Sequence, residues 1–332
     1  MERPVVLVLT QDTDTTADRG IDELTSRGVA VFRFDTSVFP SRSTLEARAD
    51  GHRWHGTLRH QGRTLDLQDV GSVWYRRPTA FTVAGELAQA EREFATREAR
   101  SAVGGLLRAL PCRWVNHPDA LVRAEYKPLQ LELARQQGLQ TPRTLITNDP
   151  DQVVAFYDEC GGELIYKVMN FPFVDAMGED PAFIYTSRVR PDDLADLGQV
   201  RTTPCLFQEY TPKKLELRVT VVGDRVFAAE IHSQHAPASA TDWRRSYSDL
   251  RYGVHELPAQ VHNACLGLTR RLNLLYSAID LILTPDGRYV FLELNPNGQW
   301  YWIEDETGLP ICSALADVLT RPSLADAHHE QE

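Results

Sequence analysis

The chain has 332 residues, 42% of them hydrophobic and 24% charged, which indicates a globular protein too long for one ordinary core. Its formal net charge of -11 argues against a general affinity for nucleic acid or for an anionic membrane surface. No apolar run is long enough to span a membrane. The five cysteines form no Cys-x-x-Cys pair, which favours reduced thiols and a cytoplasmic protein.

Residues 1–117 alternate short strands and helices. The pattern predicts the strand "PVVLVLT", a helix near "DRGIDELTSRG", the strand "VAVFRFD", a polar hairpin through "WHGTLRHQGRTLDL", the strand "SVWYRR" and a helix over about 86–110. No Gly-x-Gly-x-x-Gly turn is present, so this small α/β domain is expected to position a substrate. Arg76 and Arg77 end a strand and are expected to be exposed, either as an anion site or as solvated arginines.

The pattern changes over residues 118–205. It predicts a helix at "PLQLELARQQG", a strand at "RTLIT", a helix near "DPDQVVAFYDECGG" and a strand at "ELIYKVM". Gly138 and the pair Gly161-Gly162 are placed to end the two helices. Residues 206–320 contain two hairpins separated by a polar segment and a helix, and the polar tail 321–332 is expected to be frayed.

The second hairpin, "YSAIDLILTPDGRYVFLELNPNG", carries the strongest chemical signal. Asp286-Gly287 is a preferred pair for a two-residue type I′ loop, in which residue 285 faces 288 and Asp280 therefore faces Glu293. Asn295 lies two residues further along the same face. Facing carboxylates repel each other unless a cation lies between them, and oxygen ligands without histidine or cysteine favour Mg²⁺.

Two other interpretations of this hairpin remain. Asp280 could pair with an arginine while Glu293 is an exposed strand residue, although both acids lie in apolar runs where an unpaired charge is unfavourable. The two carboxylates could instead share a proton, as in an acid protease, but Asn295 would then have no role.

The first hairpin turns at Gly223-Asp224. It places a polar row on one face of its first strand and an apolar row on the other, which by itself indicates a solvent-facing side; the polar row is Lys214, Glu216, Arg218 and Thr220. Lys127 precedes a helix opened by proline, and Lys167 lies in an apolar strand, where a lysine usually meets a fixed anion. Polyphosphate would suit both lysines.

These residues together resemble a known superfamily. The ordered set Lys127, Lys167, "QEY" at 208–210, "ELR" at 216–218, Asp280 and "ELN" at 293–295 resembles the ATP-grasp ligases across about residues 115–318. Further segments resemble the graspetide, or microviridin-type, ribosomal peptide maturases: "LVLTQDTD", "VWYRRP", "AEYKPLQLELARQQGLQTPRTLITND", "HSQHAPASATDWRR" and "NPNGQWYW". The resemblance implies an α/β (α+β) ATP-grasp fold with a pre-ATP-grasp domain at 1–117, a central subdomain at 118–205 and a C-terminal antiparallel-sheet subdomain at 206–320.

The resemblance also implies a nucleotide site. Its phosphates would meet Lys127 and Lys167, its adenine would meet the hinge at Gln208, Glu209 and Tyr210, and its ribose would meet Glu216.

For the metal and the peptide, the resemblance implies Asp280, Glu293 and Asn295 as magnesium ligands and Arg218, Arg244 and Arg245 as cations near the transferred phosphoryl group. The acidic core of the substrate would lie near Arg76, Arg77, Arg244 and Arg245, and Asp242 and Trp243 are the further implied substrate residues. Where D-alanine ligases have an arginine, two positions before the first metal aspartate, this chain has Ala278, so Arg218 or Arg244 must neutralise the developing charge.

The implied activity is an ATP-dependent ligase that activates Asp or Glu side chains of a ribosomal precursor peptide and closes ester or amide rings with Ser, Thr or Lys side chains. ATP and Mg²⁺ are the implied cofactors, a leader-and-core peptide is the implied partner, and a homodimer is consistent with the family. The alternatives are a ligase joining an amino acid or small amine to a separate molecule, and an ATP-binding protein without ligase activity, against which the three metal ligands argue.

Two features stay open at this level. The aromatic run "GQWYW" either packs against the sheet or excludes water from an acyl phosphate. His232 and His235 either supply a base to the incoming nucleophile or are polar surface groups.

Overall fold

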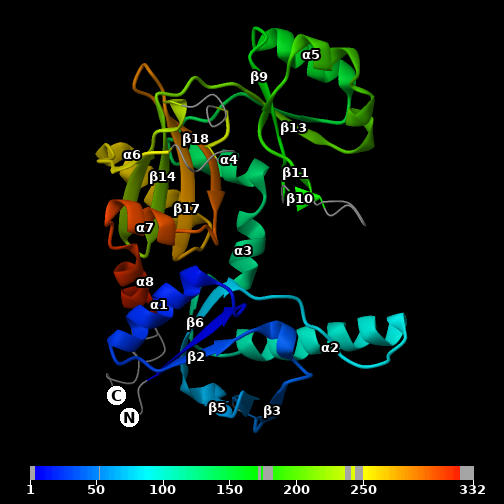
Figure 1. The fold of residues 1–332 in the computed structure, drawn as a ribbon, viewed down its shortest axis with the longest axis vertical. Helices are drawn as coiled ribbons and strands as arrows, with labels where there is room; N and C mark the ends of the chain where they lie inside the picture. Colours follow the sequence, from blue (N-terminus) through cyan, green and yellow to red (C-terminus); the bar gives the residue numbers. More distant parts are fainter. Residues whose placement is uncertain are drawn as a thin grey trace.

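The structure, a computed structural model, describes residues 4–51, 53–170, 173–174, 182–235, 241–243 and 250–321. Figure 1 shows the N-terminal part below, a large antiparallel sheet above it, and a smaller sheet with its helix beside the top of the large one. The polar tail and the segment containing Arg244 and Arg245 lie outside the described residues, as does much of the loop after Lys167.

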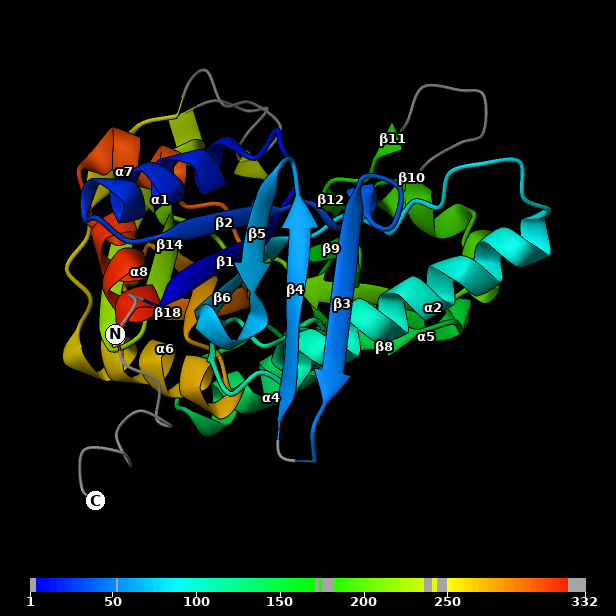
Figure 2. The same cartoon turned by 90° about the horizontal axis from the view of Figure 1, so that it is seen from below.

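The N-terminal unit is built on a parallel sheet of order β2-β1-β6-β7. Its elements are β1 (Val5–Thr10), α1 (Thr15–Ser26), β2 (Val31–Phe34), the short 3₁₀ helix Thr36–Val38, β3 (Ser43–Ala49), β4 (Trp54–His60), β5 (Arg63–Asp66), the 3₁₀ helix Leu67–Asp69, β6 (Val70–Arg77), α2 (Gln89–Arg108) and β7 (Arg113–Val115). The predicted polar hairpin β4–β5 is joined by a third strand, β3, and Figure 2 shows this sheet crossing the parallel one.

The strand β1 contributes to two cores because both of its faces are covered. Val6 and Val8 pack with α1 and with the C-terminal helices, whereas Leu7 and Leu9 pack with β4 and α2. A strand buried on both faces reads as a continuous apolar run, which is what "VVLVLT" is.

The middle of the chain forms a small antiparallel sheet of order β12-β9-β13-β8. Its elements are α3 (Pro118–Ala124), α4 (Lys127–Gln136), β8 (Thr144–Thr147), α5 (Pro150–Glu159), β9 (Leu164–Lys167), the pair β10 (Phe173–Val174) and β11 (Ala182–Phe183), β12 (Ser187–Arg188), 3₁₀ helices at Pro191–Ala195 and Gly198–Thr202, and β13 (Cys205–Glu209). Gly138 and Gly161 follow α4 and α5 with positive φ, as the helix-ending prediction requires.

The C-terminal sheet has the order β16-β15-β14-β17-β18 and is antiparallel throughout. Its elements are β14 (Leu215–Val222), β15 (Arg225–Ile231), the 3₁₀ helix Ser233–His235, β16 (Tyr252–Val254), α6 (Ala259–Arg271), β17 (Tyr276–Leu283), β18 (Tyr289–Asn295), α7 (Tyr301–Thr307) and α8 (Ile311–Thr320). The helices α3, α4 and α6 share one apolar cluster with β14, β17 and β18. They therefore cover the face of the sheet that carries Leu217 and Val219.

The helix α8 joins the two ends of the chain. It lies beside α1 (Figure 1), and its buried residues share one cluster with β1, α1 and the start of β17. Arg27, which caps the C-terminal end of α1, donates to Asp317 of α8 at 2.6 Å. The N-terminal unit is thus packed directly onto the C-terminal sheet.

The domain limits stay a prediction. Helices α3 and α4 pack on the large sheet, while β13, which spans the predicted limit near residue 205, pairs within the small sheet. Among the described residues, no helix is both long and apolar enough to cross a membrane.

Candidate active site

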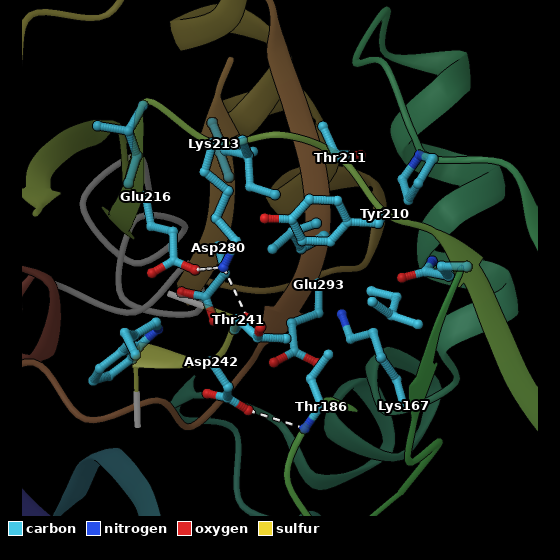
Figure 3. A pocket seen from close by; sticks show the side chains of 18 of the residues that line it. Lys167, Thr186, Tyr210, Thr211, Lys213, Glu216, Thr241, Asp242, Asp280 and Glu293 are labelled. Carbon is cyan, nitrogen blue, oxygen red and sulfur yellow. Dashed lines mark hydrogen bonds and ion pairs between the residues drawn. The ribbon is translucent and has the colours of Figure 1, made fainter. Parts of the chain in front are cut away.

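A pocket lies where the small sheet faces the large one (Figure 3). It encloses roughly 680 Å³, part of it open to solvent. Side chains from β9, β13, β14, β17 and β18 line it together with the segment 241–243; they include Lys167, Gln208, Glu209, Tyr210, Lys213, Glu216, Asp242, Trp243, Asp280 and Glu293. Most of the residues predicted for a nucleotide therefore come together in one place.

The β17–β18 hairpin confirms the pairing of Asp280 with Glu293. The predicted loop is wrong, however, because Thr284 pairs with Arg288 through a backbone bond of 3.0 Å, which leaves three residues in the turn. A bulge between Asp280 and Leu281 shifts the register back by one position, since Leu281 pairs with Phe291. The extra turn residue and the bulge cancel, and the two carboxylates face each other as predicted.

Of the predicted polar row, Lys214 precedes β14 and is exposed, whereas the residues on β14 itself do not face solvent as the strand pattern alone had indicated. Glu216 is 5% exposed and Arg218 is 6% exposed, so this face is an interior polar surface. Burial raises the pKa of Glu216, and the ammonium group of Lys213, with which it forms an ion pair, opposes that rise. Lys213 also donates to the carbonyl oxygen of Thr241 at 2.8 Å, which fixes one wall of the pocket.

Each facing carboxylate of the hairpin has a cationic partner. Arg218 lies opposite Asp280 across β14 and β17 and donates to it at 2.9 Å. Lys127, at the start of α4, lies 2.9 Å from Glu293. Burial disfavours the charge of Arg218, but Asp280, Tyr276 and Glu293 favour it, and the pKa of Arg218 is raised overall. The alternative interpretation of this hairpin is therefore half right: Asp280 does pair with an arginine, but Glu293 is not an exposed strand residue without a partner.

The third predicted metal ligand, Asn295, ends β18 and follows Glu293 on the same face. Its Oδ1 accepts a hydrogen bond from the backbone N–H of Asn297 at 2.9 Å. Glu293 and Asn295 line a second hollow together with Lys127 and Lys167. Within the described ranges no group of three or more His, Cys, Asp or Glu could hold a metal, so the candidate set is two carboxylates and one amide.

Only some of the side chains predicted to contact the nucleotide point into the pocket. Lys167 is 7% exposed and points toward Glu293 in Figure 3. Glu209 directs its carboxylate away to Arg143, at 2.9 Å, and that hydrogen bond is the main reason why the pKa of Glu209 is lowered. The guanidinium of Arg188 lies 3.6 Å from the ring centre of Tyr210. Any hinge contact by Glu209 must therefore come from its backbone.

The predicted peptide-binding arginines behave differently from each other. Arg76 is 2% exposed, so the expectation that it is free to bind an anion is wrong; successive strand residues point to opposite faces, and Arg76 points inward while Arg77 points out. Asp242 is buried and accepts the backbone N–H of Thr186 at 3.1 Å. Arg244 and Arg245 are outside the described residues.

The aromatic residues after β18 have different positions: one packs in the core, and another lies beside the pocket. Trp300 is 1% exposed and belongs to the core shared with α8. The ring of Trp302 lies against that of Trp243 at a tilt of 39°, with ring centres 5.3 Å apart, and Trp243 lines the pocket. His232 faces Glu230 at 2.9 Å, and the side chain of His235 is not among those described.

Several residues of the site carried no recognised signal in the sequence. Lys213 and Thr186 line the pocket beside the predicted residues. Asn116 and Gln130 hold the chain around Asn295 through buried amide groups. Only the "KK" pair at 213–214 could have suggested a ligand; the others are isolated polar residues whose partners are far away in the sequence.

Comparison with known proteins gives two matches that together cover nearly the whole chain. Residues 5–121 match the family described as the MvdD pre-ATP grasp domain, and residues 124–319 match the RimK-like ATP-grasp domain. The chain belongs to the RimK-like ATP-grasp family. The predicted resemblance and the α/β ATP-grasp fold are therefore confirmed.

Solved structures agree with this assignment to the ATP-grasp family. The macrocyclase MdnC bound with precursor peptide MdnA, from Microcystis aeruginosa MRC, is 32% identical, with 95% of this chain and 98% of that chain covered and a TM-score of 0.84. A RiPP-associated ATP-grasp ligase from Chryseobacterium gregarium, in complex with ADP and a leader and core peptide, is 29% identical, with 95% and 96% covered and a TM-score of 0.88.

A more distant curated relative is the ribosomal protein bS6–L-glutamate ligase of Escherichia coli O81 (strain ED1a). It is 26% identical over 208 residues, which are 60% of this chain. The match spans 65% of that ligase, a little less than two thirds of its length.

Proposed function

We propose that this ATP-grasp enzyme is a peptide macrocyclase: it phosphorylates Asp or Glu side chains of a ribosomal precursor peptide with ATP and closes ester or amide rings with Ser, Thr or Lys side chains. The observation that carries the proposal is the similarity over 95% of the chain, N-terminal unit included, to a macrocyclase solved with its precursor peptide. A ligase that shared only the ATP-grasp part would not be expected to match across residues 5–121.

The nucleotide is proposed to bind in the pocket between the two sheets. Lys167 and Lys127 border the hollow that continues from this pocket past Glu293, which supports a role for both ammonium groups in binding the phosphates. Glu216 is proposed to accept the ribose hydroxyls, and the backbone at Gln208, Glu209 and Tyr210 to meet the adenine. The similar ligase that contains ADP supports a nucleotide site.

The residues present also fit a magnesium site. Two facing carboxylates and an amide oxygen form the hard oxygen set that Mg²⁺ prefers, and Arg218 and Lys127 already balance their charge. Asp280, Glu293 and Asn295 would hold the ion. When bound, it would neutralise charge on the phosphates and polarise the transferred group.

The chain's own residues are proposed to orient the reaction and to stabilise its charge. A peptide carboxylate oxygen attacks the γ-phosphorus and ADP leaves, which gives an acyl phosphate. A hydroxyl or amine of the same peptide then attacks the acyl carbon, gives up its proton, and inorganic phosphate departs. Each ring thus consumes one ATP and removes one water from the peptide. Lys167 and Lys127 offset the spread negative charge, and Arg218 holds Asp280 in place beneath them.

Substrate binding is proposed to involve the exposed Arg77 and the segment 242–245, with Trp243 and Trp302 helping to exclude water from the acyl phosphate. Cations suit an acidic core peptide, because a carboxylate that enters a cleft needs a charged partner. A leader peptide, a homodimer and a cytoplasmic location remain predictions alongside this one.

The test is mass spectrometry of the chain incubated with ATP, Mg²⁺ and the peptide encoded beside its gene. Successive losses of water from the peptide, each with one ADP released, are expected. A peptide that gains the mass of another molecule less water would replace macrocyclisation by ligation of two separate molecules. An unmodified peptide with ATP unspent would overturn the proposed substrate.

A further inference from the structure

The loop that follows β18 is held by an unusual number of specific contacts. Asn295 opens this loop, and α7 begins just beyond it. From Leu294 to Gln299 every backbone carbonyl oxygen accepts a hydrogen bond, and the donors in order are Gln130 at 2.8 Å, Gly298 N–H at 3.4 Å, Asn116 at 2.8 Å, Arg76 at 2.7 Å, Tyr276 at 2.7 Å and Arg218 at 3.2 Å. Loops usually lie on the surface, where water accepts or donates many of their backbone hydrogen bonds. The backbone of this loop is instead held by hydrogen bonds from the surrounding protein.

Two of these donors come from the N-terminal unit. Arg76, at the end of β6, donates to the carbonyl oxygen of Asn297 and, through its other terminal nitrogen, to the side chain of Gln299 at 2.6 Å. Asn116, just after β7, donates to the carbonyl oxygens of Pro296 and Tyr276, each at 2.8 Å. Its own oxygen accepts the N–H groups of Leu275 and Tyr276, so all four hydrogen-bonding positions of the amide are used.

An ion pair with Asp14 helps to hold the side chain of Arg76 in place. Its Nε lies 3.5 Å from Asp14, which accepts the hydroxyl of Thr10 at 2.8 Å and caps α1. Burial lowers the pKa of Arg76, and Asp14 opposes that change. Both side chains are almost completely buried, so this ion pair is a fixed part of the interior and has no freedom to seek a substrate anion.

The contacts lead by one further step to the candidate metal ligand. Arg76 holds the carbonyl of Asn297, and the N–H of the same residue donates to Oδ1 of Asn295 at 2.9 Å. Groups that orient a ligand through a single hydrogen bond set its direction and affect metal affinity strongly. Arg76 lines neither the pocket nor the second hollow, so any effect on the proposed metal site acts through the loop.

We infer that Arg76 and Asn116 are positioning residues for the magnesium site, so that the N-terminal unit completes that site. The inference rests on Asn295 being a metal ligand, as in the proposed function, and it assigns Arg76 a role other than the peptide contact predicted from the sequence. It also means that residues 124–319 alone would bind a nucleotide–magnesium pair poorly.

The test uses the full chain and no peptide: calorimetric titration of ADP over a series of Mg²⁺ concentrations. The main variant is Arg76→Met with Asp14→Asn, which removes the two donors of Arg76 to the loop without leaving a buried unpaired carboxylate and keeps a residue able to cap α1. Arg76→Lys is a milder second variant that keeps the charge but offers a single donating group instead of a fork.

The expected result is that the Mg²⁺ concentration needed for tight ADP binding rises about 10- to 100-fold in the double variant, less in Arg76→Lys. ADP binding without Mg²⁺ should not change. Two controls separate positioning from loss of stability: Phe34→Leu, a fully buried residue of the same unit that does not touch the loop, and Arg48→Met, whose side chain is 83% exposed. Both should keep the parental Mg²⁺ dependence.

The inference is overturned if the folded variants keep that dependence, or if Phe34→Leu shifts it as far as the double variant does. A parent chain whose ADP binding ignores Mg²⁺ would remove the metal assignment and the inference together. Failure to cyclise the peptide would affect the proposed function but not this measurement, because no peptide is present.

Discussion

Gly298→Ala tests how tightly the loop after β18 is packed. The backbone of Gly298 packs so closely against β14 and β17 that an added Cβ would lie 2.4 Å from Nη2 of Arg218 and 2.5 Å from Cβ of Ala278. Ordinary contacts begin near 3.4 Å, so Gly298→Ala requires displacements of about 1 Å at both places (3.4 − 2.4 = 1.0 and 3.4 − 2.5 = 0.9). Ala278 is fixed in the middle of a sheet, which leaves Arg218 and the loop to move.

The displacement has two measurable consequences. Overpacking of this kind destabilises by about 1–3 kcal/mol, which a denaturant unfolding curve resolves. Arg218 holds Asp280 at 2.9 Å, so a shift of about 1 Å also disturbs the candidate metal site, and we expect peptide-dependent ADP release to fall roughly 100-fold.

Gly105→Ala is the matched control. Gly105 lies in α2, and a Cβ there meets nothing within 4 Å. Replacing a helical glycine by alanine in open space should stabilise the chain by about 0.5–1 kcal/mol and leave turnover unchanged. The same substitution should therefore have opposite signs at the two positions. If Gly298→Ala unfolded at the parental denaturant concentration and retained full turnover, the tight packing of Gly298 against Arg218 and Ala278 would be refuted.

Three further changes test other parts of the site. Lys167→Met should weaken ADP binding at least about tenfold, because it removes an ammonium group from the hollow proposed for the phosphates; unchanged affinity in calorimetry would remove Lys167 from the phosphate site. Glu293→Gln, or chelation of Mg²⁺ in the parent, should reduce ADP release about 100-fold or more, and a variant that turned over normally would exclude Glu293 as a ligand. Tyr276→Phe should cost about 1 kcal/mol at neutral pH through the lost bond to Gly298. Burial raises the pKa of Tyr276 to about 12, so the stability that this group adds is complete below pH ~10 and is lost as the pH rises toward 12. The deficit of Tyr276→Phe in unfolding free energy should therefore shrink over that interval, and a constant deficit would contradict the assignment.

Many of the strands and helices, and the pairing of Asp280 with Glu293, could be predicted from the sequence because local patterns carry them, whereas the helices α7 and α8 were not predicted. Alternation identifies the strands, and an Asp-Gly pair identifies the turn. The predicted length of the β17–β18 turn was wrong by one residue, and a bulge that no local sequence pattern predicts restored the register. The strand β3 was missed because its residues, from Ser43 to Ala49, become a strand only by pairing with β4.

The orientation of polar residues was harder to predict than their position. The same alternation describes a solvated face and an interior polar face, and only the approach of the small sheet and the loop buries Glu216 and Arg218. Arg76 was expected outside because a strand pattern does not tell which of two adjacent arginines points inward. Asn116 and Gln130 were not recognised at all, since their partners lie about 160 to 180 positions away in the chain.

Because α8 packs against α1 and β1, the N-terminal unit cannot complete its core until the end of the chain has been synthesised. One face of β1 carries Val6 and Val8, whose apolar neighbours include Ile311, Leu315 and Val318. Roughly 300 residues are translated in between, which takes about 15–60 s at ordinary elongation rates. Until α8 leaves the ribosome, α1 alone covers this face of the N-terminal sheet, and the apolar surface that α8 will bury stays open to chaperones or aggregation. Premature termination before residue 311 would thus be expected to disable the first domain made as well as the last.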